Sequence, residues 1–222
     1  MKKILFTALL VAGIGNCHAQ ISEKNCKQIT EYFTAVLNGE SSATCENKNI
    51  KHSRIDDTRA AVWACWRTAV EALQEDKLPT PVKVGIKDTL YWAMPTHPEE
   101  GARMPYHYIY KGEKPANGYP LFLYMHGSGR KQREWETGYA ICSAFDDAPS
   151  LYFIPQIPSE KHYRWAIPTQ QIAWEKLLRL AFLSGDVDAN RIFFFGISEG
   201  GYGSQRLASF YADYLAGAGP MA

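Results

Sequence analysis

The feature that most constrains the fold is a strand-like apolar run that ends abruptly among glycines. Residues 192–196 read Ile-Phe-Phe-Phe-Gly, which suits a short strand buried on both faces. Residues 196–200, Gly-Ile-Ser-Glu-Gly, then fit the Gly-x-Ser-x-Gly pattern of a nucleophile elbow, and a helical pattern follows. A serine on such a sharp turn needs small residues two positions before and after it, because larger side chains would collide with the adjacent strand or helix. The pattern predicts that Ser198 stands clear of a sheet at a helix N-terminus, where backbone N–H groups favour negative charge.

A second motif lies upstream, again directly after an apolar strand pattern. Residues 121–125 run into His126-Gly127-Ser128-Gly129. A loop of this kind lets a backbone N–H approach a substrate oxygen without a bulky side chain in the way. The backbone N–H groups of Ser128 and Gly129, together with that of Glu199 directly after the serine, are therefore predicted to form an oxyanion hole.

With both motifs in place, the region from about residue 81 to the end resembles the α/β-hydrolase fold. It is similar in particular to secreted bacterial serine esterases related to feruloyl esterases, polyhydroxybutyrate depolymerases and dienelactone hydrolases. The likeness rests on residues 126–129, on residues 188–191 (Asp-Ala-Asn-Arg) and on residues 196–201 (Gly-Ile-Ser-Glu-Gly-Gly). It implies an α/β-hydrolase fold with a mostly parallel sheet flanked by helices, and Ser198 as the catalytic nucleophile.

The catalytic triad of that family is incomplete in this sequence. The family order is Ser, then Asp or Glu, then His. After the elbow motif only Asp213 is acidic, in the following helix, and no histidine occurs. We therefore expect these 222 residues to be the front part of a longer protein, truncated at the C-terminus, with the triad acid and histidine beyond Ala222.

A long irregular connection, residues 155–168, leaves the carboxyl end of a predicted strand, where open α/β sheets place their ligand sites. It carries His162, Tyr163, Arg164 and Trp165, which are the predicted substrate-binding residues; ordinary surface packing is the alternative. The basic stretch at residues 130–133 would attract an acidic substrate or simply face water.

The alternation of strand and helix patterns supports a mostly parallel sheet. Strands are expected over residues 82–93, 106–111, 121–125, 151–154 and 192–196, with a further one beginning near 215. Helices are expected over residues 135–145 and 170–183, the latter with an inward stripe of Ile172, Leu177, Leu180 and Ala181.

The N-terminal end has the features of a signal peptide over residues 1–19. Lys2 and Lys3 precede an apolar segment too short to span a bilayer, and a small residue, Ala19, precedes the expected cleavage site. The protein is therefore expected to be secreted or periplasmic, and a lipoprotein lipidated at Cys17 is the alternative. Loss of this segment changes the formal net charge from +1 to −1, so no nucleic-acid or membrane-surface footprint is expected.

Residues 20–80 are predicted to form a helical N-terminal extension, and residues 81–222 the hydrolase domain. The extension has helical patterns over residues 25–37 and 57–77, with Ser53 and Asp56 spaced like a capping box. It would be either a lid or docking element over the active site, or an extension packed on the hydrolase core.

Four cysteines remain after the signal segment, namely Cys26, Cys45, Cys65 and Cys142, and they allow three pairings. We favour Cys26 with Cys45, because both lie in the polar N-terminal segment, and expect Cys65 and Cys142 to be buried thiols. No spacing resembles a zinc site, and neither a metal nor a cofactor is expected.

Three hypotheses for the function remain open. The leading one is a secreted serine hydrolase that cleaves carboxylic esters through a Ser198 acyl-enzyme, acting on small or polysaccharide-linked acyl or feruloyl esters. The alternatives are a serine peptidase of the prolyl oligopeptidase type and a non-catalytic binding module on a degenerate hydrolase scaffold. Neither the substrate nor the oligomeric state follows from the sequence.

Overall fold

The computed structural model describes residues 21–40, 42–45, 48–75, 77–161 and 164–221. The chain divides into two compact units, of which the first ends at Glu75 and the second begins at Asp76. The predicted signal peptide, residues 1–19, lies outside the described residues. Within the described ranges, no helix combines the length and the apolar character needed to cross a bilayer.

The first unit is a pair of helices that pack against each other, α1 (Glu23–Leu37) and α2 (Ile55–Glu71), with a 3-10 turn at His52–Arg54. Helix α1 begins after Ser22, whose side chain accepts a hydrogen bond from the Asn25 N–H at 3.3 Å. Helix α2 has no side-chain cap, so the predicted capping box of Ser53 and Asp56 is not formed.

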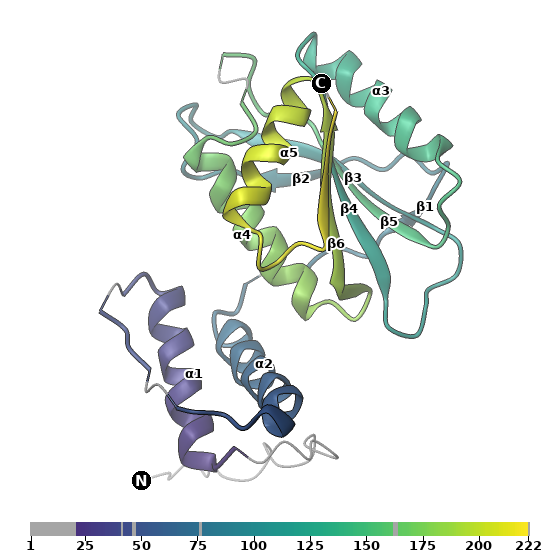
Figure 1. The fold of residues 1–222 in the computed structure, drawn as a ribbon. Helices are drawn as coiled ribbons and strands as arrows, with labels where there is room; N and C mark the ends of the chain where they lie inside the picture. The colour runs from purple at the N-terminus through teal and green to yellow at the C-terminus, as the bar shows by residue number, and fades with distance from the viewer. Residues whose placement is uncertain (1–20, 41, 46–47, 76, 162–163, 222) are drawn as a thin grey trace, which may run out of the picture. The chain divides into compact units, whose positions relative to one another are not determined.

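The second unit is built on one seven-stranded sheet (Figure 1). Its strands are β1 (Val82–Lys83), β2 (Leu90–Ala93), β3 (Arg103–Lys111), β4 (Tyr119–Met125), β5 (Ser150–Pro155), β6 (Val187–Ile197) and β7 (Gly217–Met221). The order is β1-β3-β5-β4-β6-β7, with β2 paired to β3. Strand β4 runs parallel to β5 and β6, and β6 parallel to β7, whereas β3 is antiparallel to β2 and β5. The expected α/β class with a mostly parallel sheet is confirmed.

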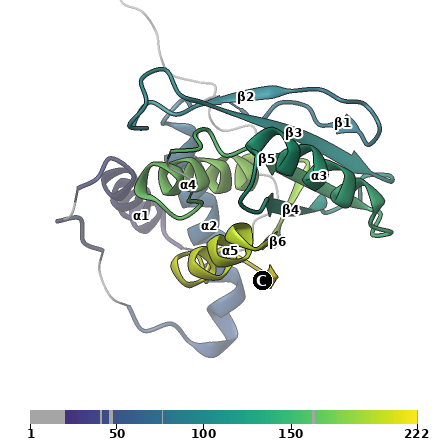
Figure 2. The ribbon, with the colours of Figure 1, turned by 90° about the horizontal axis from the view of Figure 1, so that it is seen from above.

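Helices α3 (Lys131–Ala144), α4 (Pro168–Leu183) and α5 (Glu199–Phe210) cover the two faces of the sheet (Figure 2). Strand residues alternate between these faces. On one face, Tyr124 of β4 packs with Trp135 of α3. On the other, Phe194 of β6 meets Tyr211, directly after α5, with ring centroids 6.1 Å apart. The parallel strands therefore carry apolar residues on both faces, which explains their continuous apolar runs.

One residue of the predicted inward stripe of α4 is misplaced. Leu177, Leu180 and Ala181 are buried, but Ile172 is 49% exposed. The buried face of α4 includes Trp174, whose indole is fully enclosed. This face is rotated away from Ile172, so the prediction for Ile172 was wrong.

The favoured cysteine pairing is also corrected. The Sγ atom of Cys26 lies 2.7 Å from that of Cys65, and Cys45 is exposed. The sequence could not anticipate this, because the relative rotation of two helices decides which sulfurs meet. The expected burial of Cys65 and Cys142 is confirmed.

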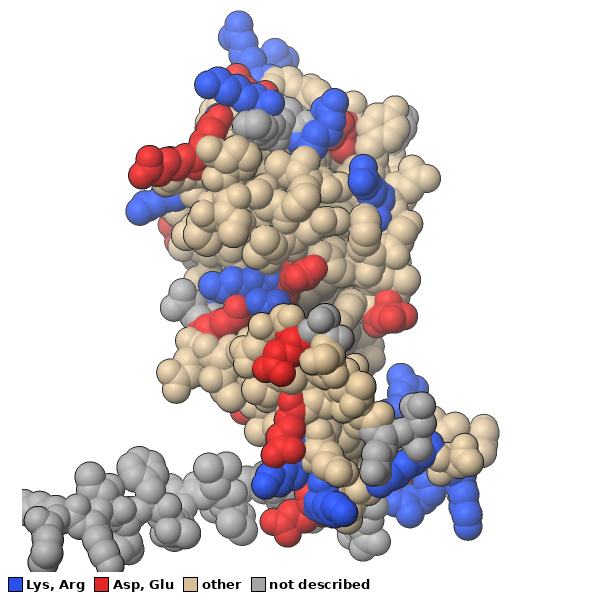
Figure 3. Space-filling model, turned by 90° about the vertical axis from the view of Figure 1, so that its left-hand side faces the viewer, with Lys and Arg blue, Asp and Glu red and all other residues tan. Residues whose placement is uncertain are grey.

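The surface of the second unit carries both signs of charge. On the face drawn in Figure 3, lysine and arginine side chains of this unit lie among aspartate and glutamate side chains and do not gather into one basic patch.

Candidate active site

The proposed nucleophile lies on a strained turn between β6 and α5. Ser198 has φ 55° and ψ −117°, and it is one of two non-glycine residues with positive φ among those described. Such a conformation costs about 1–3 kcal/mol and persists only where the surrounding structure imposes it. Ser198 is exposed, and its side chain makes no capping hydrogen bond to α5. The turn therefore leaves Ser198 exposed at a helix N-terminus.

The two glycines of the motif make this turn possible. A Cβ on Gly196 would overlap the Met125 carbonyl oxygen at the end of β4 and would lie 2.6 Å from backbone atoms of Gly200. A Cβ on Gly200 would also overlap the Met125 carbonyl and would lie 2.9 Å from the His126 carbonyl oxygen. The steric requirement predicted from the sequence is confirmed, and the obstacle is the end of the neighbouring strand.

Two further glycines of α5 extend this close packing. A Cβ on Gly201 would overlap the Met221 carbonyl of β7, and one on Gly203 would lie 2.6 Å from the Trp165 Cβ. The Ser198 N–H donates to the same Met221 carbonyl at 2.7 Å. Sequence reasoning missed these contacts, although the run Gly-Gly-x-Gly after the serine signals a helix face that packs closely on other backbone.

The structure brings the predicted oxyanion loop to the elbow. A Cβ built on Gly127 would lie 3.4 Å from the Ser198 Cβ and 3.3 Å from the Ile197 carbonyl oxygen. Ser128 and Gly129 follow and are both exposed. Glu199 occupies the first position of α5, where a helix leaves its N–H groups without intrahelical acceptors. The serine and the segments that carry all three predicted oxyanion donors thus share one corner of the sheet.

His126, the first residue of this loop, is fully buried. Its Nε2 accepts a hydrogen bond from the Ile157 N–H at 3.1 Å, so the neutral ring carries its proton on Nδ1, which donates to the Gly127 carbonyl at 2.9 Å. Burial lowers the pKa of the His126 imidazole to about 4. The ring is therefore neutral at pH 7, fixed in one tautomer, and it braces the loop.

A carboxylate that the sequence did not single out also contacts the loop. A Cβ on Gly129 would lie 2.5 Å from the Glu134 Oε1, and one on Gly127 would lie 3.6 Å from the Glu134 Oε2. Glu134 belongs to the first turns of α3, which begins directly after the loop. The glycine at position 129 therefore leaves space for the Glu134 carboxylate.

Two of the four predicted substrate-binding residues, His162 and Tyr163, lie outside the described residues. Arg164 is at the site: its side chain is 66% exposed, and its Nη1 lies 3.4 Å from the Glu199 Oε2. Burial raises the pKa of the Glu199 carboxyl group, and the Arg164 guanidinium opposes this shift. A cationic side chain thus lies beside Glu199, the residue that follows the elbow serine.

Trp165 does not have the position expected of a substrate contact. Its side chain is completely buried, and its Nε1 donates to the His126 carbonyl at 2.9 Å. Its own carbonyl accepts from the Trp174 Nε1 at 3.0 Å. The prediction for Trp165 is corrected, because this indole joins the oxyanion loop to α4 and to the glycine face of α5.

The described residues form no metal site, and His107 and His126 of the second unit are both buried. No cluster of three or more His, Cys, Asp or Glu side chains suited to a metal occurs among them. His107 is buried, with its Nδ1 2.7 Å from the Asp88 carbonyl and its ring stacked on Trp135 at 4.2 Å. Burial lowers its pKa below the usual value. Both His107 and His126 are therefore structural side chains.

No protein-family model and no curated protein matches this chain, but solved structures do. A thermostable esterase is 24% identical over 60% of this chain and 40% of its own, with a TM-score of 0.47. An arylesterase is 15% identical over 86% and 55%, with a TM-score of 0.36. An acetyl xylan esterase from Paenibacillus sp. R4 is 14% identical over 87% and 63%, with a TM-score of 0.35. The chain spans less than two thirds of each, and likeness at this level does not carry an activity to it.

Proposed function

We propose that the protein is a secreted serine hydrolase that cleaves carboxylic esters, with Ser198 as the nucleophile. One observation carries the proposal: Ser198 is exposed at φ 55° and ψ −117°, and the predicted oxyanion loop lies beside it, so that a Cβ built on Gly127 would be 3.4 Å from the Ser198 Cβ. A serine that served only to cap α5 would have β-region dihedral angles and would accept a hydrogen bond from the helix backbone. Ser198 has neither feature.

The proposed reaction follows from where charge develops. The Ser198 hydroxyl loses its proton to a general base and attacks the ester carbonyl carbon, whose oxygen becomes negative. The backbone N–H groups of Glu199 and Ser128, with Gly129 nearby, donate to that oxygen, and each such donor contributes on the order of 3 kcal/mol in the transition state. The N-terminus of α5 adds its favourable field. The alcohol leaves, and water then hydrolyses the acyl-enzyme.

The general base of this mechanism is a histidine other than His126 or His107, because both are buried and hydrogen-bonded in structural roles. The family order implied by the resemblance places it after Ser198 in the sequence. We include this order in the proposal.

The substrate side of the site includes Arg164, which stands beside Glu199 with most of its side chain exposed. A guanidinium in this position would bind a carboxylate or an oxygen-rich group near the scissile ester. Esters of acyl or feruloyl groups linked to polysaccharides fit this requirement and are the substrate class we infer.

The test is covalent labelling of the complete gene product with a fluorophosphonate probe, followed by peptide mapping. We expect a single label on Ser198 and none in Ser198→Ala, while the matched variant Ser128→Ala keeps the label because the loop contributes its backbone. Hydrolysis of p-nitrophenyl acetate without cleavage of peptide substrates would identify an esterase. An unlabelled Ser198 in a correctly folded protein would exclude both enzymatic hypotheses and favour a binding module.

A further inference from the structure

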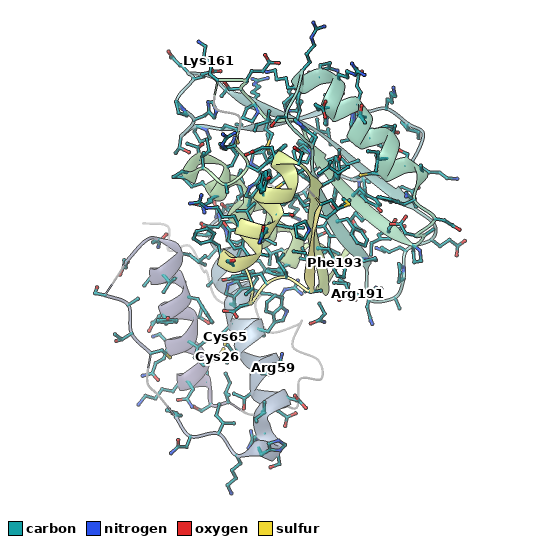
Figure 4. All side chains as sticks on the ribbon, turned by 45° about the horizontal axis from the view of Figure 1, so that its top comes forward. Cys26, Arg59, Cys65, Lys161, Arg191 and Phe193 are labelled. Atoms are coloured by element: carbon teal, nitrogen blue, oxygen red, sulfur yellow. The ribbon has the colours of Figure 1, made fainter. Side chains whose placement is uncertain are left out.

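Two cysteine side chains meet between the helices of the first unit. Cys26 lies on α1 and Cys65 on α2, 39 residues apart in sequence, and their Sγ atoms are 2.7 Å apart. Figure 4 shows the two side chains together in the space between the helices. Cys65 is 1% exposed and Cys26 is partly exposed. A small side-chain rotation would bring the sulfurs to the bond length of a disulfide, about 2.05 Å.

The surrounding core is small, which makes a cross-link there effective. Helix α1 has no fully buried residue, and the four buried residues of α2 are Ala61, Cys65, Ala69 and Val70. Helical hairpins of this size bury too little apolar surface for high stability, and small exported domains commonly depend on disulfides. The sulfur pair occupies the helix interface, where a covalent bond would fix the packing of α1 on α2.

The two sulfurs do not belong to a metal site. Zinc requires about four ligands, of which cysteine and histidine are the commonest. In the part of the chain that the structure describes, no third His, Cys, Asp or Glu side chain joins a cluster that could hold a metal. Disulfide formation is therefore the chemistry that this pair of thiols best fits.

We propose that Cys26 and Cys65 form a disulfide that cross-links α1 to α2 in the exported protein. The proposal assumes that the protein is exported, as the signal-peptide pattern of residues 1–19 predicts. It does not depend on the esterase proposal. The other two cysteines, Cys45 and Cys142, stay reduced: Cys45 is exposed on the connection between the helices, and Cys142 is completely buried in α3 of the second unit.

The oxidant is a protein disulfide of the thiol-oxidoreductase class. The more accessible thiol, Cys26, attacks as its thiolate, forms a mixed disulfide and releases one oxidoreductase thiolate. Cys65 then loses its proton, attacks the Cys26 sulfur and releases the second oxidoreductase thiolate. Two electrons and two protons leave the cysteine pair, and the oxidant becomes a dithiol. Burial raises the pKa of the Cys65 thiol to about 12, so little of it is thiolate at neutral pH and it is not the thiol that attacks first.

The direct test is to map the thiols of the complete protein exported into an oxidising compartment. Free thiols are blocked with N-ethylmaleimide in denaturant, the protein is digested without reductant, and the peptides are identified by mass spectrometry. We expect a linked peptide pair containing Cys26 and Cys65, with Cys45 and Cys142 alkylated. Alkylation of both Cys26 and Cys65, or a link from Cys26 to Cys45, would overturn the proposal.

A second measurement separates the cross-link from a packing role of the sulfurs. Dithiothreitol is expected to lower the unfolding midpoint of the helical unit by about 10 °C or more in the wild type and in the matched variant Cys45→Ala. It is expected to have no effect on Cys26→Ala, whose midpoint already equals that of the reduced wild type. An unchanged midpoint of the wild type after reduction would contradict the proposal even if Cys26→Ala failed to fold.

Discussion

Replacing Gly200 by alanine tests the elbow geometry with a change of one methyl group. Gly200 lies in the first turn of α5, and helix propensity alone predicts that alanine would stabilise the helix by about 1 kcal/mol. The structure predicts the opposite sign. The new Cβ would lie 2.5 Å from the Met125 carbonyl carbon and 2.9 Å from the His126 carbonyl oxygen, and it would overlap the Met125 carbonyl oxygen.

The magnitude follows from what these neighbours are. Both are backbone carbonyls at the end of β4, so they cannot rotate aside as a flexible side chain would, and either β4 or α5 must shift. Overpacking of this kind costs about 1–3 kcal/mol, and more where backbone moves. In a domain of this size each kcal/mol corresponds to about 2–4 °C. We therefore expect Gly200→Ala to lower the unfolding midpoint by about 3–10 °C.

The matched control is Gly185→Ala, in the turn before β6. Nothing lies within 4 Å of a Cβ at Gly185, and its φ is not in the positive range. This substitution is expected to be neutral or to stabilise by about 0.4–1 kcal/mol. The measurements are thermal and urea unfolding followed by circular dichroism, with the fluorophosphonate labelling rate as a second readout. Equal midpoints for Gly200→Ala and Gly185→Ala would refute the steric account of the elbow.

Three other perturbations follow from the buried polar contacts. Trp165→Phe and Trp174→Phe each remove one indole donor to a carbonyl and should each lower the free energy of unfolding by about 1–3 kcal/mol. Only Trp165→Phe should also slow fluorophosphonate labelling of the elbow serine, by about tenfold, because only its indole bonds to the loop beside that serine. Because the pKa of His126 is about 4 in the folded state and 6.5 ordinarily, the unfolded chain binds more protons between these values. Urea unfolding should show stability falling by up to about 3 kcal/mol as the pH drops from 6.5 to 4, with a flatter profile in His126→Gln. Lys111→Met should destabilise by about 3 kcal/mol, because Asp147, 2.7 Å from the ammonium group, loses its cationic partner. A loss below 1 kcal/mol by urea unfolding would show that this pair is only a surface contact.

The sequence predicted the parts of the site that depend on short-range geometry. A serine between two glycines after an apolar run indicated the elbow, and the structure has Ser198 in that strained conformation. The glycine-containing loop after residues 121–125 was expected to lie beside the elbow and does so, because loops that follow neighbouring parallel strands meet at the same sheet edge.

The errors concern residues whose roles depend on distant parts of the chain. Trp165 reads as a surface aromatic in an irregular loop, yet it is enclosed by His126 and Trp174. Ile172 fits an apolar helix pattern but lies just outside the buried stripe of α4. The contribution of Glu134 to the loop has no sequence signal at all, because only the direction of α3 brings its carboxylate to Gly129.

The sequence alone therefore determined the alternation of strands and helices from β3 onward, the sharp turn at Ser198 and the small residues that this turn needs. These features depend on neighbours within a few positions, where sterics and hydrophobic periodicity act directly. The single strand expected over residues 82–93 is instead the two short strands β1 and β2. Only the tertiary structure decided that Met125 is the obstacle behind Gly200, that Trp165 supports the oxyanion loop and that Cys26 meets Cys65. These contacts join residues far apart in the chain, and the rotation and packing of whole helices and strands determine which of them form.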